Sequence, residues 1–175
     1  MTVPLPILTE RLLIRQFDPE VDVEAAVSVY CDAEVMRYVT GGPLSDEEAV
    51  RGALEKYVRA QQEYGFSSWA VVERETGRVI GDVGFGIFEP TNEVELGYTL
   101  AREFWGRGYA TEAAGSCLSA GLAHLDVPRI IAVVDAENQA SLRVAEHVGM
   151  ASVKTIAVHH RPHLLFEAHA SRRKI

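Results

Sequence analysis

The segment VELGYTLAREFWGRGYATEA, residues 94–113, predicts a strand, then a glycine-spaced turn, then the start of a helix. The turn contains Gly106 and Gly108, followed by the small Ala110, so the main chain there can approach a ligand closely. The first N–H groups of a helix have no partner within the helix, and the helix dipole is positive at that end. The turn is therefore a candidate anion site whose amides suit a pyrophosphate.

The glycine spacing differs from two common nucleotide-binding motifs. A dinucleotide fingerprint needs a third glycine and an early parallel βαβ unit, with an acidic residue about twenty positions later. A nucleoside triphosphate loop needs the sequence G-K-[ST], which this chain lacks. A tight turn without a ligand is the alternative interpretation of these glycines.

The periodicity of the rest of the chain predicts one domain over residues 1–175, with an α/β (α+β) fold. Strands are expected at residues 12–16, 68–73, 79–88, 93–100, 127–134, 151–158 and 164–170. Helices are expected at residues 21–39, as one or two segments, and at 45–63, 108–125 and 138–147. Ser45 precedes Glu48 by three residues, which predicts a capping box at the start of the second helical region.

Composition indicates a packed domain without a disulfide framework. The chain has 175 residues, 47% of them hydrophobic and 24% charged, which is the balance of a globular core. Cys31 and Cys117 lack the spacing of a metal site or a C-x-x-C motif, so buried free thiols are expected.

Charge and the amino-terminal sequence limit the partners. The net charge is −8, and basic residues are dispersed apart from Arg172, Arg173 and Lys174, which argues against nucleic acid and modestly favours cationic substrates. The amino terminus lacks the pattern of a signal peptide, and no window has the apolar length of a membrane span. A cytoplasmic protein without a membrane partner is expected.

Residues 104–113, Phe-Trp-Gly-Arg-Gly-Tyr-Ala-Thr-Glu-Ala, resemble the acetyl-CoA loop of the GNAT superfamily of N-acetyltransferases. The family pattern Q/R-x-x-G-x-G/A begins the third helix, and Trp105 stands where that pattern has Gln or Arg. An aromatic residue there resembles the ribosomal-protein N-acetyltransferase (RimJ/RimL) branch. The likeness covers nearly the whole chain through TERL at 9–12, VMRY at 35–38, VIG at 79–81, NQAS at 138–141 and Gly149-Met150.

This resemblance implies the sheet geometry and the co-substrate. It implies a mixed, mostly antiparallel sheet of about seven strands with a central splay, flanked by about four helices. Acetyl-CoA is the implied co-substrate, with its pantetheine arm completing the ladder between the splayed strands. The implied binding residues are Tyr98, Thr99, Leu100, Trp105, Gly106, Arg107, Gly108, Tyr109, Ala110, Thr111, Asn138 and Ser141. For Asn138, a helix N-cap is an equally supported role.

Direct acetyl transfer needs a neutral amine, a donor to the thioester oxygen and a proton for the departing thiolate. Glu95 resembles the family's usual base, although a solvent-facing strand glutamate is the alternative, and an ordered water could accept the proton instead. Asp82 and Glu93 are weaker candidates. An N–H group near Leu100 would polarise the thioester oxygen.

The proton donor to sulfur departs from the pattern of many superfamily members. Those members carry a tyrosine seven residues after the asparagine, where this chain has Ala145. The branch resemblance points instead to Ser141, for which an ordinary first-turn serine is the alternative. Neither cysteine has cationic neighbours in sequence that would activate it.

The sequence HHRPH at residues 159–163 invites a metal interpretation, but it lacks helical spacing and a nearby carboxylate. We expect a polar turn near the acceptor mouth, with substrate contact as the second interpretation and no metal.

The predicted function is acetyl transfer from acetyl-CoA to an amine acceptor, which is either a peptide N-terminal amine or a small molecule. A non-catalytic acyl-CoA-binding or regulatory module is the main alternative, and thioester hydrolysis is a third. The family resemblance also suggests a possible homodimer.

Overall fold

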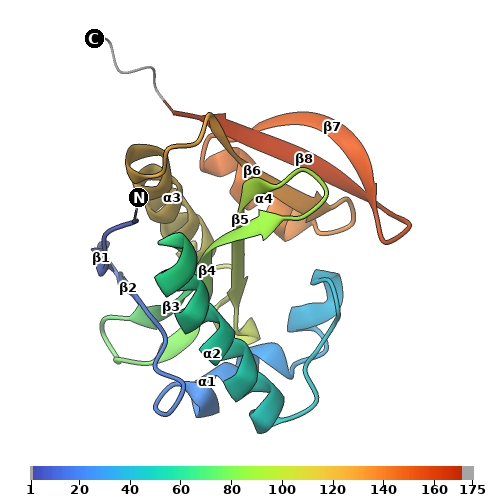
Figure 1. The fold of residues 1–175 in the computed structure, drawn as a ribbon. Coiled ribbons are helices and arrows are strands. Elements are labelled where there is room, and N and C mark those ends of the chain that lie inside the picture. The colour runs from blue at the N-terminus through green and yellow to red at the C-terminus, as the bar shows by residue number, and fades with distance from the viewer. Residues whose placement is uncertain (1, 171–175) are drawn as a thin grey trace.

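An eight-stranded sheet runs through the protein in the order β1-β2-β3-β4-β5-β6-β8-β7 (Figure 1). This computed structural model describes residues 2–170, so the basic residues Arg172, Arg173 and Lys174 lie outside the described part. The strands are β1 Ile7–Leu8, β2 Leu12–Arg15, β3 Ser68–Glu73, β4 Val79–Phe88, β5 Glu93–Leu100, β6 Arg129–Asp135, β7 Ala151–Val158 and β8 Arg161–His169. Neighbouring strands are antiparallel except β5 and β6, which are parallel.

Helices cover both faces of the sheet (Figure 1). They are α1 Val23–Tyr30, α2 Glu47–Tyr64, α3 Tyr109–His124 and α4 Gln139–His147, with 3-10 turns η1 Val35–Tyr38 and η2 Arg102–Phe104. Tyr30 of α1 and Tyr57 of α2 lie beside Asp82 on one face. On the other face Tyr98 bonds to Ser141 of α4, and α3 packs against β4, β5 and β6. The predicted α/β fold is confirmed, with one more strand than expected because β1 adds a short edge.

The start of α2 corrects one prediction. Asp46, rather than Ser45, is the N-cap, and its Oδ1 accepts a hydrogen bond from the Ala49 N–H at 2.9 Å. The Ser45 hydroxyl donates to Asp46 at 2.8 Å and so supports the cap without forming it. The helix ends at Tyr64, and the C-cap Gly65 has a φ of 77°, the left-handed conformation that glycine adopts readily.

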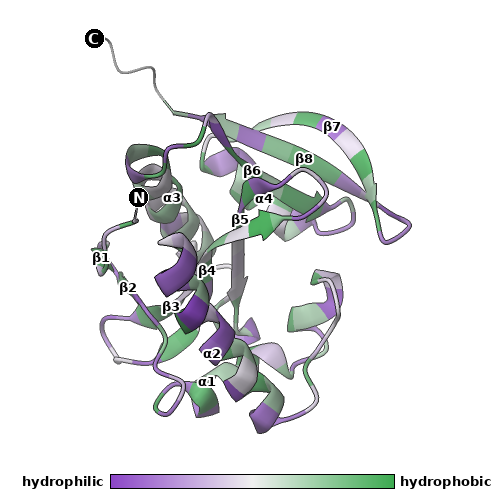
Figure 2. Ribbon diagram, viewed as in Figure 1, coloured by the Kyte–Doolittle hydropathy of each residue, from purple (hydrophilic) through white to green (hydrophobic). Residues whose placement is uncertain are grey.

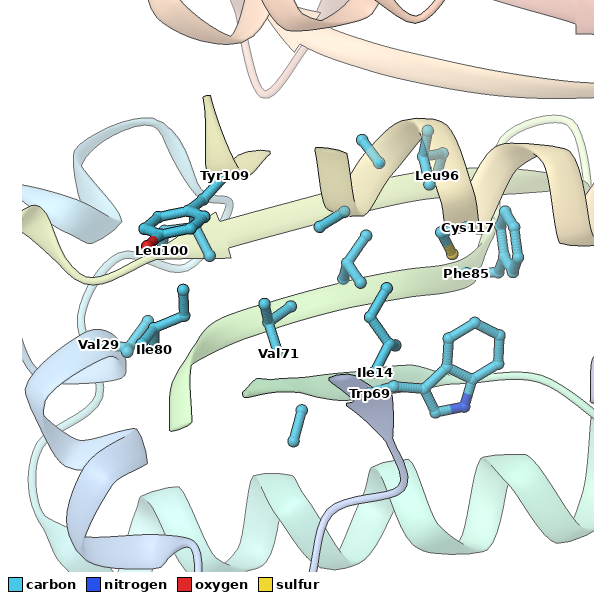
Figure 3. Close-up of a cluster of buried hydrophobic side chains, with 14 of the residues drawn as sticks. Ile14, Val29, Trp69, Val71, Ile80, Phe85, Leu96, Leu100, Tyr109 and Cys117 are labelled. Atoms are coloured by element: carbon cyan, nitrogen blue, oxygen red, sulfur yellow. The ribbon is translucent and has the colours of Figure 1, made fainter. Parts of the chain in front are cut away.

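The core extends over both faces of the sheet, and on the α3 face Figure 3 shows Phe85, Leu96 and Cys117 close together. Gly121 brings α3 close to the sheet, since a Cβ at that position would lie 2.4 Å from a ring carbon of Phe85. Cys117 is fully buried, which raises the pKa of its thiol well above the usual value, whereas Cys31 is only half-buried. In Figure 2 the hydrophilic residues are prominent along α2, at the surface.

β5 and β6 diverge along their length. β5 pairs with β4 from Glu93 to Leu100, yet within residues 2–170 its ladder with β6 consists of Glu95 opposite Ile131. Arg129, at the start of β6, donates from Nε to Glu93 at 2.6 Å and thereby ties the two strands together at their closed end. The predicted central splay is confirmed, and it opens toward the carboxyl ends of both strands.

The β7–β8 hairpin has a two-residue turn at His159 and His160, whose φ angles are 47° and 64°. Two consecutive positive φ angles are typical of the type I′ turn, which matches the twist of a hairpin. β8 therefore begins at Arg161, three residues earlier than predicted, and it lies between β6 and β7. This order places the start of β8 beside the open end of the splay.

Candidate active site

A cleft of about 1140 Å³ passes through the sheet at the splay. The amino-terminal ends of α3 and α4 line it on one face. On the other face it is lined by η1 and by the β4–β5 and β7–β8 turns. Of the predicted binding residues, Arg107 stays outside the lining, and the structure brings together Tyr98, Thr99, Leu100, Trp105, Gly106, Gly108, Tyr109, Ala110, Thr111, Asn138 and Ser141.

The glycine-spaced turn has the backbone conformation that its sequence predicts. Gly106 and Gly108 have φ angles of 72° and 78°, which side-chain-bearing residues rarely adopt, and Gly108 is the N-cap of α3. The first residues of α3, from Tyr109 to Thr111, face the cleft. The unpaired amides and the positive end of a long helix dipole are therefore available to an anion there.

A clamp from the first strands fixes this turn. Glu112 of α3 accepts hydrogen bonds from the Thr9 hydroxyl at 2.6 Å and from Arg11 N and Nε at 2.8 and 2.6 Å. Arg11 also donates from Nη1 to the Arg107 carbonyl at 2.9 Å. Although partial burial opposes it, these donors hold the pKa of Glu112 below its usual value. About a hundred residues separate the partners, so no local pattern in the sequence reveals their contact.

Two aromatic residues anchor the turn to the sheet. Trp105 donates from its indole N–H to the Leu100 carbonyl at 2.8 Å, so the residue that departs from the Q/R pattern bonds the end of β5. Tyr109 donates its hydroxyl to Glu73 at 2.5 Å, and the Arg11 guanidinium lies 4.4 Å from the centre of its ring. The hydrogen bond from Tyr109 lowers the pKa of Glu73.

Of the three carboxylates considered from the sequence, Glu95 lies in the cleft. Its burial raises the pKa to about 7, against an opposing interaction with the Val133 amide across the splay. Glu93 is paired with Arg129, whose hydrogen bond lowers the Glu93 pKa. Asp82 is buried outside the cleft lining, and burial raises its pKa to about 6. Glu95 is therefore the carboxylate with both access and a pKa suited to exchange a proton near neutrality.

Asn138 and Ser141 form the start of α4. The Asn138 side chain accepts from the Ser141 N–H at 3.1 Å, so the N-cap role is present in the structure. Ser141 in turn accepts at its carbonyl from the Tyr98 hydroxyl at 2.9 Å, which holds α4 to β5. Burial raises the Tyr98 pKa to about 12, so this phenol is a neutral donor. Ala145 is fully buried in α4, and the position of the family's tyrosine is filled by core packing.

The wall on the η1 face combines residues of the predicted HHRPH turn with Tyr38, Asp135 and Glu137, for which the sequence predicted no role. Arg161 contacts Asp135 and Glu137 at 3.1 and 3.0 Å, and its guanidinium lies 5.9 Å from the centre of the Tyr38 ring. His163 Nδ1 lies 3.0 Å from the Arg161 carbonyl and donates to it. His159 and His163 both line the cleft. These residues come from η1, the end of β6 and β8, and only the fold brings them together.

Residues 2–170 contain neither a cluster of metal-binding side chains nor a helix suited to a bilayer. No group of three or more His, Cys, Asp or Glu residues is placed to hold a metal ion. No helix in the same range has the length and apolar character needed to cross a bilayer.

Residues 11–151 match the family model described as acetyltransferase (GNAT) domain. The chain belongs to the GNAT family of acetyltransferases. It is 32% identical to the uncharacterised protein YkkB of Bacillus subtilis (strain 168), over 95% of this chain and 97% of that protein. The family predicted from residues 104–113 is confirmed, and the chain is an acetyl-CoA-dependent N-acetyltransferase.

Solved structures share this fold. The GNAT-family acetyltransferase from Bacillus anthracis superposes with a TM-score of 0.79 at 28% identity, over 93% of this chain and 96% of that chain. RimL, a ribosomal L7/L12 alpha-N-protein acetyltransferase in complex with coenzyme A, gives a TM-score of 0.78 at 17% identity, over 94% and 98%. At 17% identity this likeness shows the common fold.

Proposed function

We propose that this GNAT enzyme transfers an acetyl group directly from acetyl-CoA to a primary amine held beside Glu95. The observation that carries the proposal is the position of Glu95, half-buried in a cleft that opens on both faces of the sheet. Acetyl-CoA enters from the α3–α4 face and the amine from the face of η1. The thioester and the amine then meet at the splay.

The turn at residues 106–111 suits the pyrophosphate of coenzyme A. Its left-handed glycines leave the main chain accessible, and the amides at the start of α3 are fixed before binding. The pantetheine arm lies along β5 beyond Glu95, where the ladder to β6 stops. Its amide groups there replace the missing strand partner, which offsets the cost of unpaired main-chain groups.

Glu95 takes a proton from the ammonium form of the acceptor, directly or through one water, and so produces the nucleophilic amine. The nitrogen attacks the thioester carbon, and the negative oxygen accepts a hydrogen bond from an amide near Leu100. The carbon–sulfur bond then breaks. The remaining surplus proton on nitrogen reaches the thiolate through the Ser141 hydroxyl, and the products are the amide and free coenzyme A.

The acceptor is a peptide N-terminal amine or a small amine. RimL, which shares the fold, is by its name a protein α-N-acetyltransferase, and this supports including peptides. Glu34 and Glu89 also line the acceptor side of the cleft, and their charge supports a cationic acceptor.

Glu95→Gln tests the proposal. We expect amine-dependent release of coenzyme A to be lost, while acetyl-CoA binding measured by calorimetry is retained. Glu75→Gln, in the exposed β3–β4 turn, is the matched control and should keep full turnover. Undiminished turnover by Glu95→Gln would overturn the base assignment. Acetyl-CoA binding without turnover of any amine by the wild-type protein would favour the binding-module alternative.

A further inference from the structure

Three glycines lie next to Glu95 on its own face of the sheet. In the ladder between β4 and β5, Gly84 lies opposite Gly97, and Gly86 lies opposite Glu95. Directly opposed residues of an antiparallel pair project to the same face, and so do residues two apart in a strand. On its own face, Glu95 therefore has Gly86 opposite it, Gly97 next to it along β5 and Gly84 diagonally across, whereas Glu93 and Phe88 lie toward the β4–β5 turn.

Packing explains only one of these three glycines. A Cβ at Gly84 would lie 2.0 Å from the Ser67 carbonyl oxygen, so no larger residue fits there. A Cβ at Gly86 or Gly97 would meet no atom within 4 Å, and both residues are exposed. Neither has a positive φ angle, so the backbone does not require glycine. Glycine inside a strand costs about 0.5–1 kcal/mol, and at these two positions no packing or backbone constraint offsets that cost.

The empty space lies where an acceptor has to be. A side chain at position 86 would stand about 5 Å from that of Glu95, and one at position 97 would flank it along β5. Gly97 itself lines the cleft. Any residue with a Cβ at these positions would occupy the approach of an amine to the Glu95 carboxylate.

We propose that Gly86 and Gly97 form the acceptor floor, a side-chain-free strip that sets how wide the acceptor can be next to its amine. This rests on the proposed function and adds the acceptor class. The floor admits a primary amine whose neighbouring carbon carries a further substituent, because the substituent lies flat against the main chain of β4 and β5. Gly86 and Gly97 are therefore specificity-determining residues.

Gly97→Val and Gly86→Val test the acceptor floor with glycinamide, L-alaninamide and L-leucinamide. These amines differ only in the substituent beside the amino group. Valine suits an extended strand, so both variants should melt at or above the wild-type temperature. We expect kcat/KM for L-leucinamide to fall about tenfold to a hundredfold relative to glycinamide, the size of effect that overpacking produces. The acetyl-CoA dissociation constant should stay unchanged in Gly86→Val, because Gly86 lies on β4, away from the strand that carries the pantetheine arm.

Gly52→Ala is the matched control, because a Cβ at Gly52 in α2 also meets no atom within 4 Å and lies outside the cleft. It should gain stability and keep the wild-type order of the three amines. The acceptor floor is refuted if the valine variants lose all three amines equally or keep the wild-type selectivity. It is refuted as well if the wild-type protein acetylates other amines but none of these three. Failure of the proposed function itself would give a different result, because the wild-type protein would then acetylate no amine at all.

Discussion

At the level of single residues, the burial of Glu95 predicts how the activity depends on pH. Its pKa of about 7 means that the basic form increases as the pH passes through that value. We expect kcat/KM to rise from about pH 6 to about pH 8, and this rise to be absent from the residual activity of Glu95→Gln. A pH profile of initial rates at saturating acetyl-CoA measures it. An unchanged profile in the variant would assign the titration to another group.

The same burial predicts a change in stability with pH. The folded pKa of Glu95 is raised from 4.5 to about 7, so its contribution is favourable below the unfolded value and is lost as the pH rises through about 7. Between about pH 5 and pH 8 the free energy of unfolding of Glu95→Gln should rise by about 2 kcal/mol relative to wild type. Urea denaturation at both pH values checks this, and a pH-independent difference contradicts the buried carboxylate.

Asn138 has a structural role that can be separated from a ligand role. Asn138→Ala removes the acceptor for the Ser141 amide and should cost about 1 kcal/mol. Asn138→Asp keeps an oxygen cap but lacks the amide donor, so it should retain stability and bind acetyl-CoA more weakly. Thermal melts combined with calorimetric titration distinguish the two roles. If Asn138→Asp binds acetyl-CoA as tightly as the wild-type protein, the role of Asn138 is only to cap α4.

At the level of helices and strands, local patterns predicted most elements and missed details that tertiary contacts decide. The glycines at 106 and 108 marked the start of α3, and both have left-handed φ angles that few other residues adopt. Ser45 was predicted to cap α2, but the adjacent Asp46 forms the cap, and both side chains carry an oxygen suited to that role. The early start of β8 depends on positive φ angles at His159 and His160, which are uncommon for any residue other than glycine.

The candidate site was predictable where its residues are close in sequence. Residues 98–111 form a continuous strand, turn and helix, and the pattern identified them as a unit. The walls supplied by Tyr38, Asp135 and His163 depend on strand order and register, for which one sequence has no local signal. The clamp on Glu112 was not predicted either, because its partners Thr9 and Arg11 lie about a hundred residues away in sequence.

The clamp itself leads to a prediction. Glu112→Ala removes three hydrogen bonds that hold the turn at the start of α3, and charged hydrogen bonds contribute about 1.5–3 kcal/mol each. We expect acetyl-CoA affinity to fall about tenfold or more, although Glu112 has no place in the cleft lining. Glu103→Ala, which breaks the exposed pair with Arg78, should leave the affinity unchanged. Equal affinities in the two variants would show that the turn holds its shape without the clamp.

At the level of the whole molecule, acetyl-CoA should stabilise the fold. A ligand at 100 times its dissociation constant adds about 2.7 kcal/mol, which raises the melting temperature by several degrees. Gly108→Val should lose this shift, because its φ of 78° and its place in the turn both require glycine. Gly77→Val carries a similar strain at φ 72° in the β3–β4 turn and should retain the shift. Equal shifts in both variants would show that the coenzyme does not bind at the α3 turn.

The parallel contact of Glu95 with Ile131 is where the two halves of the sheet join through the backbone. Beyond it, β5 and β6 have no further pairing within residues 2–170, so amides on their facing edges have no strand-to-strand bond to slow exchange with solvent deuterium. Binding of acetyl-CoA should therefore protect amides on both edges together, although about thirty residues of chain separate them. Isotope exchange would then report the coenzyme as a ninth strand of the sheet, one that the polypeptide does not encode.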